Sequence, residues 1–496
     1  MRRIQSSVLR LSILACLTVA GFAVSSAASA DCTNLNTCYG AGALSGDTGD
    51  RNSAFGLSAL GSNTGSHNTA IGYEALGGSN GGLNSGSYNT ATGLLALQGA
   101  GDSEEHFQAG DYNTAHGAMA LAGNSTGNNN TAVGALALVG QQYGFRHQNG
   151  SYNTAIGSGA MIHNETGSYN TASGGRAMQA NSGGSYNTAT GYQALLGSPE
   201  DADWSDVYAL GSYNTANGSY ALQHNHKGNY NTASGSSALF TNTTGGNNTA
   251  TGNNALYSNT TGNFNTADGG GALKSATTGV RNVALGYQAG LAITTGSDNI
   301  ILGAANQGVA AENGVIRIGN KTYQKKAFIA GIRGVTTGSA TASTVFVDVN
   351  GQLGTIKSSR RYKEDIQSMG SVSERLFGLR PVTFRYTQPF DDGSKPVQYG
   401  LIAEEVAEVM PELVVYGEDG KPETVSYHLL ATLLLNEVQK EHRVSKALQE
   451  QVQAQAVQLA ALNRQAAEVA DLKKQVAGLT KLVGNSEKVR MVASAR

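Results

Sequence analysis

One recurring segment decides the fold of this chain, and a clear copy of it reads SYNTATGYQAL at residues 185–195. Its asparagine recurs fourteen times, and eight of the thirteen spacings are 17 residues. The copies lie at Asn52, Asn68, Asn89, Asn113, Asn130, Asn153, Asn170, Asn187, Asn214, Asn231, Asn248, Asn265, Asn282 and Asn299. Self-similarity at a short fixed period is typical of a solenoid, in which each repeat packs on its neighbours. The sequence therefore predicts a parallel β-roll solenoid over residues 31–303, in a mainly β protein.

The residue types within each repeat suit a tightly wound coil. Asn-Thr-Ala-x-Gly predicts one short extended run and x-Ala-Leu a second, with turns at Gly, Asn and Ser between them. The position after the first alanine holds residues as different as Ile71, His116, Asn217 and Asp268. We therefore expect that position to face outward and the alanine to face inward. At roughly 4.8 Å per coil, fourteen coils would form a rod on the order of 65 Å long.

So thin a coil has little interior of its own, which favours lateral association into a homotrimer. The array resembles the heads of YadA-type trimeric adhesins, whose coils carry a Ser-Val-Ala-Ile-Gly motif. The closest matches are NTAIG at residues 68–72 and NVALG at residues 282–286, although the period here is longer. The resemblance implies a trimeric head that binds a host-surface or other extracellular ligand.

Insertions lengthen the repeats near residues 77–86, 98–110, 139–150 and 196–212. The last of them holds Trp204, the only tryptophan of the chain. Insertions in a solenoid form exposed loops, which often bind ligands. Trp204 therefore marks a predicted binding loop, with tolerated variation in surface length as the alternative.

Composition argues against several other functional classes. Net charge is −2 over 496 residues, so no basic surface predicts nucleic-acid binding. A calcium-binding β-roll would need a recurrent aspartate, and Asp268-Gly269-Gly270 does not recur. An ice-binding face would need a regular outward rank of threonine, which the repeat does offer. A glycan-cleaving enzyme would need paired carboxylates in a groove, and the scattered acids of the array give that class little basis.

The N-terminus predicts export. Residues 1–30 read as a signal peptide, with a basic start, an apolar run over residues 9–24 and small residues at 28–30. No transmembrane helix is expected after its removal, so the protein is predicted to be secreted or displayed at the cell surface. Cys32 and Cys38 would remain, and in an oxidising compartment they predict a disulfide. Neither a metal site nor a cofactor is expected.

Beyond the array, residues 304–357 predict a β-rich connector. β-Branched runs at residues 315–319, 327–332 and 345–349 predict strands, and Asn350-Gly351 predicts a hairpin turn.

Residues 358–440 predict a small α+β domain. Strands are expected at residues 381–386 and around a turn at Asp419-Gly420, and a strand runs into a helix over residues 399–409. A last helix starts near His428.

The last helix carries an apolar seam. Steps of four and three residues run from Leu448 to Val483 with one stammer, which predicts a coiled coil over residues 441–485, followed by a tail at 486–496. A monomeric amphipathic helix is the alternative.

Residues 358–440 resemble the C-terminal intramolecular chaperone and self-cleaving peptidase of endosialidase-type phage tailspikes. The resemblance rests on SSRRYK at residues 358–363, LRPV at 379–382 and GLIAEEV at 400–406. Ser359 stands where many members have Asp, and Glu404 where Gln is common. In that family a trimeric chaperone templates the preceding fibre and a Ser-Lys dyad then cuts the chain just before the serine.

Carried over, the resemblance makes Ser358 the nucleophile, Lys363 the general base and Lys357–Ser358 the scissile bond. Lysine serves as a base only if burial or positive neighbours lower its pKa from about 10.4, and Arg360 and Arg361 are such neighbours. In the alternative interpretation, Ser358 caps a helix and Lys363 is solvated. The sequence thus predicts a trimeric fibre that matures by self-cleavage, or a structural surface or appendage protein whose chaperone stays uncut.

Overall fold

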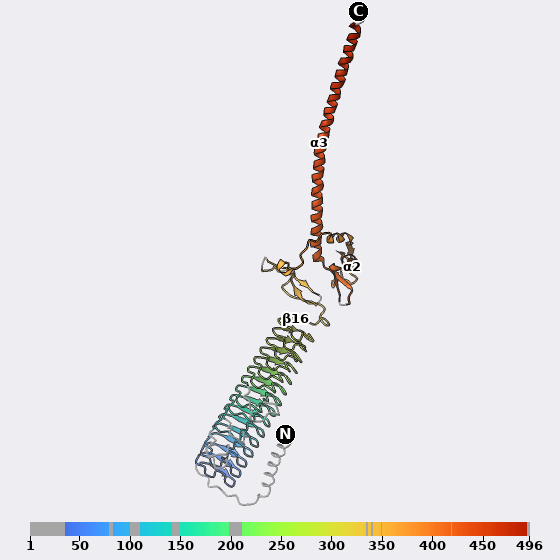
Figure 1. Ribbon diagram of the computed structural model, residues 1–496. Coiled ribbons are helices and arrows are strands. Elements are labelled where there is room, and N and C mark those ends of the chain that lie inside the picture. The colour runs from blue at the N-terminus through green and yellow to red at the C-terminus, as the bar shows by residue number, and fades with distance from the viewer. Residues whose placement is uncertain are drawn as a thin grey trace. The chain divides into compact units, whose positions relative to one another are not determined.

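The computed structural model describes residues 35–78, 83–99, 110–140, 149–197, 211–333, 336–338, 341–348, 350–417 and 419–493. The chain forms two compact units, Met1–Ile329 and Ala330–Arg496. The first unit contains the repeats, and the second contains short strands and one long helix (Figure 1).

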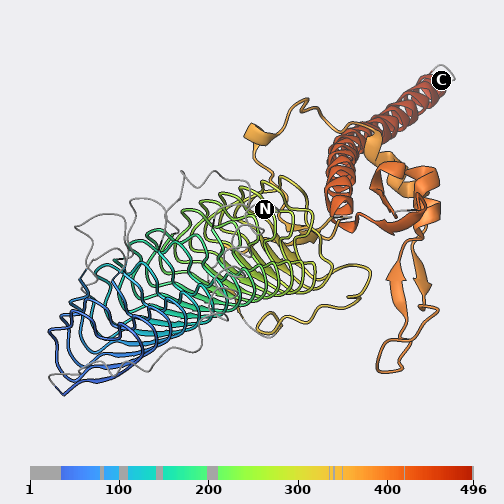
Figure 2. The ribbon, with the colours of Figure 1, turned by 90° about the horizontal axis from the view of Figure 1, so that it is seen from below.

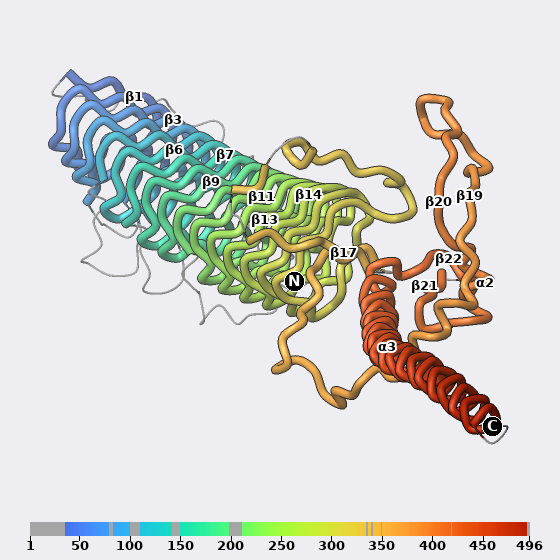
Figure 3. Tube along the Cα trace, turned by 90° about the horizontal axis from the view of Figure 1, so that it is seen from above, coloured from blue at the N-terminus to red at the C-terminus, as the bar shows by residue number. Residues whose placement is uncertain are grey.

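A sixteen-stranded parallel sheet runs the length of the first unit, with its strands in sequence order. The strands are β1 (Thr37–Tyr39), β2 (Ser53–Phe55), β3 (Thr69–Ile71), β4 (Thr90–Thr92), β5 (Thr114–His116), β6 (Thr131–Val133), β7 (Thr154–Ile156), β8 (Thr171–Ser173), β9 (Thr188–Thr190), β10 (Thr215–Asn217), β11 (Thr232–Ser234), β12 (Thr249–Thr251), β13 (Thr266–Asp268), β14 (Val283–Leu285), β15 (Ile300–Leu302) and β16 (Ile316–Ile318). Figures 2 and 3 show the coils stacked one on the next. The predicted parallel solenoid is confirmed, and at about 4.8 Å per strand it spans roughly 70 Å.

Every strand from β2 to β15 buries its middle residue and turns its flanking residues outward, and the middle residues of β1 and β16 are only partly buried. In thirteen of the sixteen strands the middle residue is alanine, and the alanines of neighbouring strands lie in register, as Ala172 does on Ala189. The variable position after it is exposed at Ile71, His116 and Asp268, which confirms the predicted orientation. The threonines before the alanines form a regular outward row. The residues after the alanines form a second outward row of mixed types, so this side of the sheet is not the uniform threonine surface that an ice-binding face would need.

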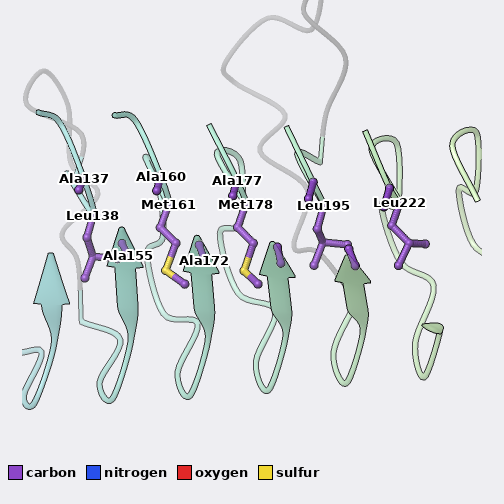
Figure 4. Packing of buried hydrophobic residues seen from close by; sticks show 14 of the residues in the cluster. Ala137, Leu138, Ala155, Ala160, Met161, Ala172, Ala177, Met178, Leu195 and Leu222 are labelled. Carbon is purple, nitrogen blue, oxygen red and sulfur yellow. The ribbon is translucent and has the colours of Figure 1, made fainter. Parts of the chain in front are cut away.

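The core is completed by a leucine or methionine from most coils, Leu60 to Leu273, stacked beside the alanines (Figure 4). The sequence predicted an extended run here, and that prediction is wrong because these residues sit in a turn with left-handed backbone. Met178 has a φ of 51° and Arg176 a φ of 58°. Such residues cost on the order of 1 kcal/mol each. In return their N–H groups point along the rod, and that of Met178 donates to Ala194 O at 3.0 Å.

Glycine is required where successive turns touch. Gly174 has a φ of 139°, and a Cβ atom built on it would lie 2.4 Å from the carbonyl oxygen of Gly191 in the next coil. Any side chain at this position would therefore push the coils apart.

Buried asparagines join the coils along the rod. The Nδ2 of Asn187 donates to the Gly211 carbonyl at 2.9 Å, and its Oδ1 accepts the backbone N–H of Asn214 at 2.9 Å. The same pair of bonds repeats from coil to coil, and the repeating asparagines are almost completely buried. This column of side chains, the asparagine ladder, satisfies backbone groups that would otherwise be orphaned inside the coil.

Both ends of the solenoid depart from the repeat. In the first coil Cys38 replaces the inward alanine, and the Asp47 carboxylate accepts from the Nδ2 of Asn63 at 2.9 Å. In the last coil Arg317 replaces it and binds Glu312 through a 2.7 Å ion pair. Charged and polar side chains thus close the ends of the apolar core, as the terminal repeats of solenoids must.

The insertions leave the register of the sheet unchanged. Ala189 pairs with Ala216 across the longest spacing. The insertions all follow the buried Leu of a coil, after residues 78, 99, 140 and 197. Trp204, the predicted binding residue, lies outside the described residues.

In the second unit, β17 (Phe346–Val347) and β18 (Leu353–Gly354) form the hairpin expected around Asn350-Gly351. No strand forms at residues 327–332, all of which are described; the prediction is wrong there, because this run has no strand beside it and Phe328 is 91% exposed.

The remaining elements follow the predicted order. They are the 3-10 helices η2 (Arg360–Tyr362), η3 (Val372–Gly378) and η4 (Pro411–Leu413), the strands β19 (Val382–Phe384), β20 (Gln398–Gly400), β21 (Val414–Tyr416) and β22 (Pro422–Val425), and the helices α2 (Ala403–Val409) and α3 (Tyr427–Ala493). A small core of Val406, Met410, Leu413, Val425 and Leu433 holds α2, β22 and the first turns of α3 together.

Candidate functional site

The turn of η2 brings Ser358 and Lys363 together. Ser359 precedes the turn, and two backbone bonds close it, from Tyr362 N to Ser359 O at 3.0 Å and from Lys363 N to Arg360 O at 3.1 Å. Lys363 thereby folds back, and its Nζ donates to Ser358 Oγ at 3.2 Å. A spacing of five residues is thus enough to join the two groups within one turn.

The geometry contradicts the alternative interpretation in which Ser358 caps a helix. The N-cap of η2 is Ser359, whose side chain makes no capping bond, so Ser358 is not a helix cap. Its hydroxyl instead contacts an amine, which is the partner that a serine nucleophile needs. Both Ser358 and Lys363 are exposed in the single chain.

The ring of Tyr362 contacts Lys357, the residue before the predicted scissile bond. The Nζ of Lys357 lies 4.7 Å from the centre of its ring, and the guanidinium carbon of Arg361 lies 4.9 Å from it. Both distances are within the range of a cation–π contact. Sequence reasoning missed Tyr362, because a lone aromatic in a basic run carries no spacing signal.

The motif segments behind the resemblance meet in space. Val382 pairs with Gly400 in the β19–β20 sheet, and Arg380 forms an ion pair with Glu405 on α2. A Cβ atom at Gly400 would lie 2.7 Å from the hydroxyl of Tyr427, so a side chain at this position would displace that hydroxyl. That hydroxyl accepts the N–H of Leu401 at 2.9 Å and so joins the first residue of α3 to this segment.

A second serine–lysine pair lies between η3 and α3. Ser373 is buried, donates to Glu437 and lies 3.5 Å from the Nζ of Lys440. Hydrogen bonding to Glu437 raises the pKa of Lys440, and the hydroxyl of Ser373 lowers the pKa of Glu437. Lys440 is therefore held as a cation and Ser373 is a structural donor, not an activated nucleophile. No local sequence pattern predicts this pair, since Ser373 and Glu437 stand 64 residues apart.

Other predicted site residues lie in the first unit. Cys38 is disulfide-bonded, and its predicted partner, Cys32, lies outside the described residues. Within the described ranges, no three His, Cys, Asp or Glu side chains are grouped to hold a metal ion. The helices in these ranges include none with the length and apolar character needed to cross a membrane.

Comparison with known families bears on the region that begins at Ser358. The family model described as chaperone of endosialidase matches residues 358–415. We call these residues the chaperone segment. No curated protein and no solved structure matches the chain.

The chaperone segment starts at the candidate nucleophile and includes η2, β19, β20 and α2. The match confirms the resemblance predicted for this part of the chain and implies a trimeric, fibre-like protein with a C-terminal chaperone. It does not extend to the repeats, whose likeness to adhesin heads stays a prediction.

Proposed function

We propose that the protein is an extracellular homotrimeric fibre for adhesion or receptor binding, released from its C-terminal chaperone by cleavage between Lys357 and Ser358. The observation that carries this proposal is the 3.2 Å contact between Lys363 Nζ and Ser358 Oγ at the first residue of the chaperone segment.

The chemistry uses this chain's own groups. Neutral Lys363 takes the hydroxyl proton of Ser358 while Oγ attacks the carbonyl carbon of Lys357. The C–N bond then breaks, Lys363 returns the proton to the leaving amide nitrogen, and an ester joins Lys357 to the serine oxygen. Water hydrolyses the ester and leaves Ser358 at the new N-terminus. No cofactor is needed.

Trimerisation is proposed because two apolar surfaces have no partner within the described chain. The outward residues of β14, β15 and β16 are Val, Ile or Leu, and Ile318 is 75% exposed. Parallel sheets are normally covered on both faces. The apolar seam of α3 from Leu448 to Val483 is also exposed, and a seam of this length is typical of a coiled coil.

Assembly would also complete the site. A lysine becomes a base only where burial or positive charge favours its neutral form, and Lys363 is exposed in the single chain. Packing of three chains around η2 would exclude the water, so that cleavage would follow assembly of the trimer.

The test is a denaturing gel of the purified protein, followed by N-terminal sequencing. Wild-type chain should yield a fragment that begins at Ser358, and Ser358→Ala should remain whole. Ser359→Ala is the matched control, because it changes the adjacent hydroxyl and should still cut. A Ser358→Ala chain that still yields this fragment would refute the proposed nucleophile. A wild-type chain that stays whole would refute self-cleavage and favour the alternative, a structural surface protein whose chaperone stays uncut.

Ligand binding is tested separately. We propose that the insertion with Trp204 contributes to recognition, because all the insertions follow the same position of the coil. Removing residues 198–210 should abolish binding to host-cell surfaces while leaving the trimer intact. Equal binding by the shortened fibre would contradict this role.

A further inference from the structure

Five exposed tyrosines form a continuous stack on consecutive coils. They are Tyr152, Tyr169, Tyr186, Tyr213 and Tyr230. Neighbouring ring centres lie 4.9–5.0 Å apart, the ring planes differ by 2–8°, and each residue is 49–58% exposed. We call this column the tyrosine ladder.

The backbone explains the alignment of the tyrosine ladder. All five residues are left-handed, with φ between 59° and 61°, and this fixed conformation projects each side chain in the same direction. The column is bounded by Asn129 and Asn247, which have the same conformation. Asparagine tolerates this conformation better than tyrosine does, so the preference of the backbone does not explain why tyrosine occupies these positions. Stacking between rings offsets part of the cost, at about 0.5–1.5 kcal/mol for each pair.

The stack favours coupling between the ortho carbons of neighbouring tyrosine rings. Ring faces inside the column cover one another, and each tyrosine nevertheless keeps about half of its surface exposed to water. Because neighbouring rings are nearly parallel with centres 4.9–5.0 Å apart, a small side-chain rotation is enough to bring two ortho carbons into bonding range. A tyrosyl radical formed in this column would meet its partner in the same chain before meeting another molecule.

We propose that the tyrosine ladder is a site of oxidative cross-linking, in which a haem peroxidase and hydrogen peroxide join tyrosines of successive coils as dityrosine. Two phenols each lose one electron and the hydroxyl proton, and one peroxide is reduced to two waters. One carbon–carbon bond forms between the ortho carbons. Each of these carbons then passes its hydrogen to its own phenolic oxygen, which restores both rings.

Such bonds would staple successive coils. A bond from Tyr152 to Tyr169 closes a short loop between neighbouring coils, and loop closure in the unfolded chain stabilises the folded state. Cross-linking is independent of cleavage at Ser358, because all five residues precede that bond.

The experiment treats dilute full-length protein with a haem peroxidase and hydrogen peroxide, then measures dityrosine fluorescence and maps the cross-linked peptides by mass spectrometry. The expected products join stacked neighbours within one chain. The variant Tyr112→Phe, Tyr169→Phe, Tyr213→Phe interrupts every parallel Tyr–Tyr stack among the described residues, since Tyr88 and Tyr112 form the remaining stacked pair. The edge-on pair of Tyr192 and Tyr220 is left unchanged. Phenylalanine stacks equally well but cannot couple, so most of the dityrosine should be lost.

The matched control is Tyr39→Phe, Tyr73→Phe, Tyr287→Phe, which removes three exposed tyrosines outside the stacks. Its dityrosine yield should equal that of the wild type. A ladder variant with undiminished yield would overturn the proposal. So would cross-links found only between chains, which appear as concentration-dependent dimers on a denaturing gel.

Discussion

At the scale of single residues, the asparagine ladder makes one side chain serve two coils. Each amide donates to one backbone carbonyl and accepts from one backbone N–H, so both functions of the side chain are used. An aspartate could not replace it in the middle, since a carboxylate cannot donate. The first coil keeps the asparagine: Asn36 Nδ2 donates to the Gly49 carbonyl at 3.0 Å, and its Oδ1 accepts the N–H of Asn52 at 2.7 Å.

Substituting Asn248 should therefore be costly. Asn248→Ala leaves the Gly262 carbonyl and the Asn265 N–H without their 2.8 and 2.9 Å partners, and we expect a loss of roughly 3 kcal/mol, because a buried unsatisfied group costs about 1–3 kcal/mol. Asn253→Ala, at an exposed neighbouring position, should change stability by less than about 0.5 kcal/mol. Urea denaturation of both variants measures the difference, and equal midpoints would contradict the role of the ladder.

Acid should weaken the solenoid through His163. Burial lowers the pKa of His163 to about 4 from its ordinary value of 6.5. Between these values the unfolded chain binds the proton and the folded chain does not, so stability falls as the pH drops from 6.5 to 4. The largest loss is roughly 3 kcal/mol.

Unfolding followed at several pH values checks this behaviour. His163→Asn should reduce the dependence in that window, because asparagine tolerates the φ of 68° found there and does not titrate. Some dependence should remain, since burial also lowers the pKa of His224 and of His226. The exposed His116→Asn should keep the wild-type slope. An unchanged slope in His163→Asn would refute the assignment.

At the scale of elements, η2 turns a short basic run into a site. Tyr362→Leu removes the ring that holds Lys357 and Arg361 and should slow self-cleavage several-fold, since a cation–π contact at an exposed site is worth about 0.5–1 kcal/mol. Tyr362→Phe keeps the ring face and should cut at the wild-type rate. Both rates can be followed on gels after refolding of the uncut chain. Slow cleavage in the Phe variant would point to the hydroxyl instead.

The coil was predictable from its period, but its conformation was not. Asn-Thr-Ala-x-Gly identified the strand because small and β-branched residues alternate there with fixed orientation. The turn at Ala-Leu was mistaken for a strand, since leucine rarely adopts a left-handed backbone and only stacking against the next coil holds it there. The first and last coils were not counted among the fourteen repeats, because Cys38 and Arg317 replace the alanine that defines the pattern.

The candidate site was predictable only in part. Ser358 and Lys363 are close in sequence, so their contact follows from one local turn. The contacts of Ser373 with Glu437 and Lys440 depend on how η3 packs against α3, which no local pattern encodes.

At the scale of the whole molecule, oligomerisation should be controlled from the seam of α3. Leu459→Asp places a charge in that seam and should prevent trimer formation and, with it, cleavage. Val457→Asp introduces the same charge at an equally exposed apolar residue off the seam, and should leave both unchanged. Sedimentation of the two variants gives the oligomeric state. A trimeric Leu459→Asp chain would show that the seam does not assemble the molecule.

Each coil packs only on the coils before and after it, and this has a consequence for how the number of repeats in the gene can change. A duplication or deletion of 17 codons inside the array adds or removes one whole coil, and the two coils that become adjacent still present matching strands, glycines and asparagines. Unequal recombination between the repeats would therefore yield folded products of different reach. Fibre length becomes a heritable trait that can vary by whole coils, while the end coils and the chaperone segment stay the same.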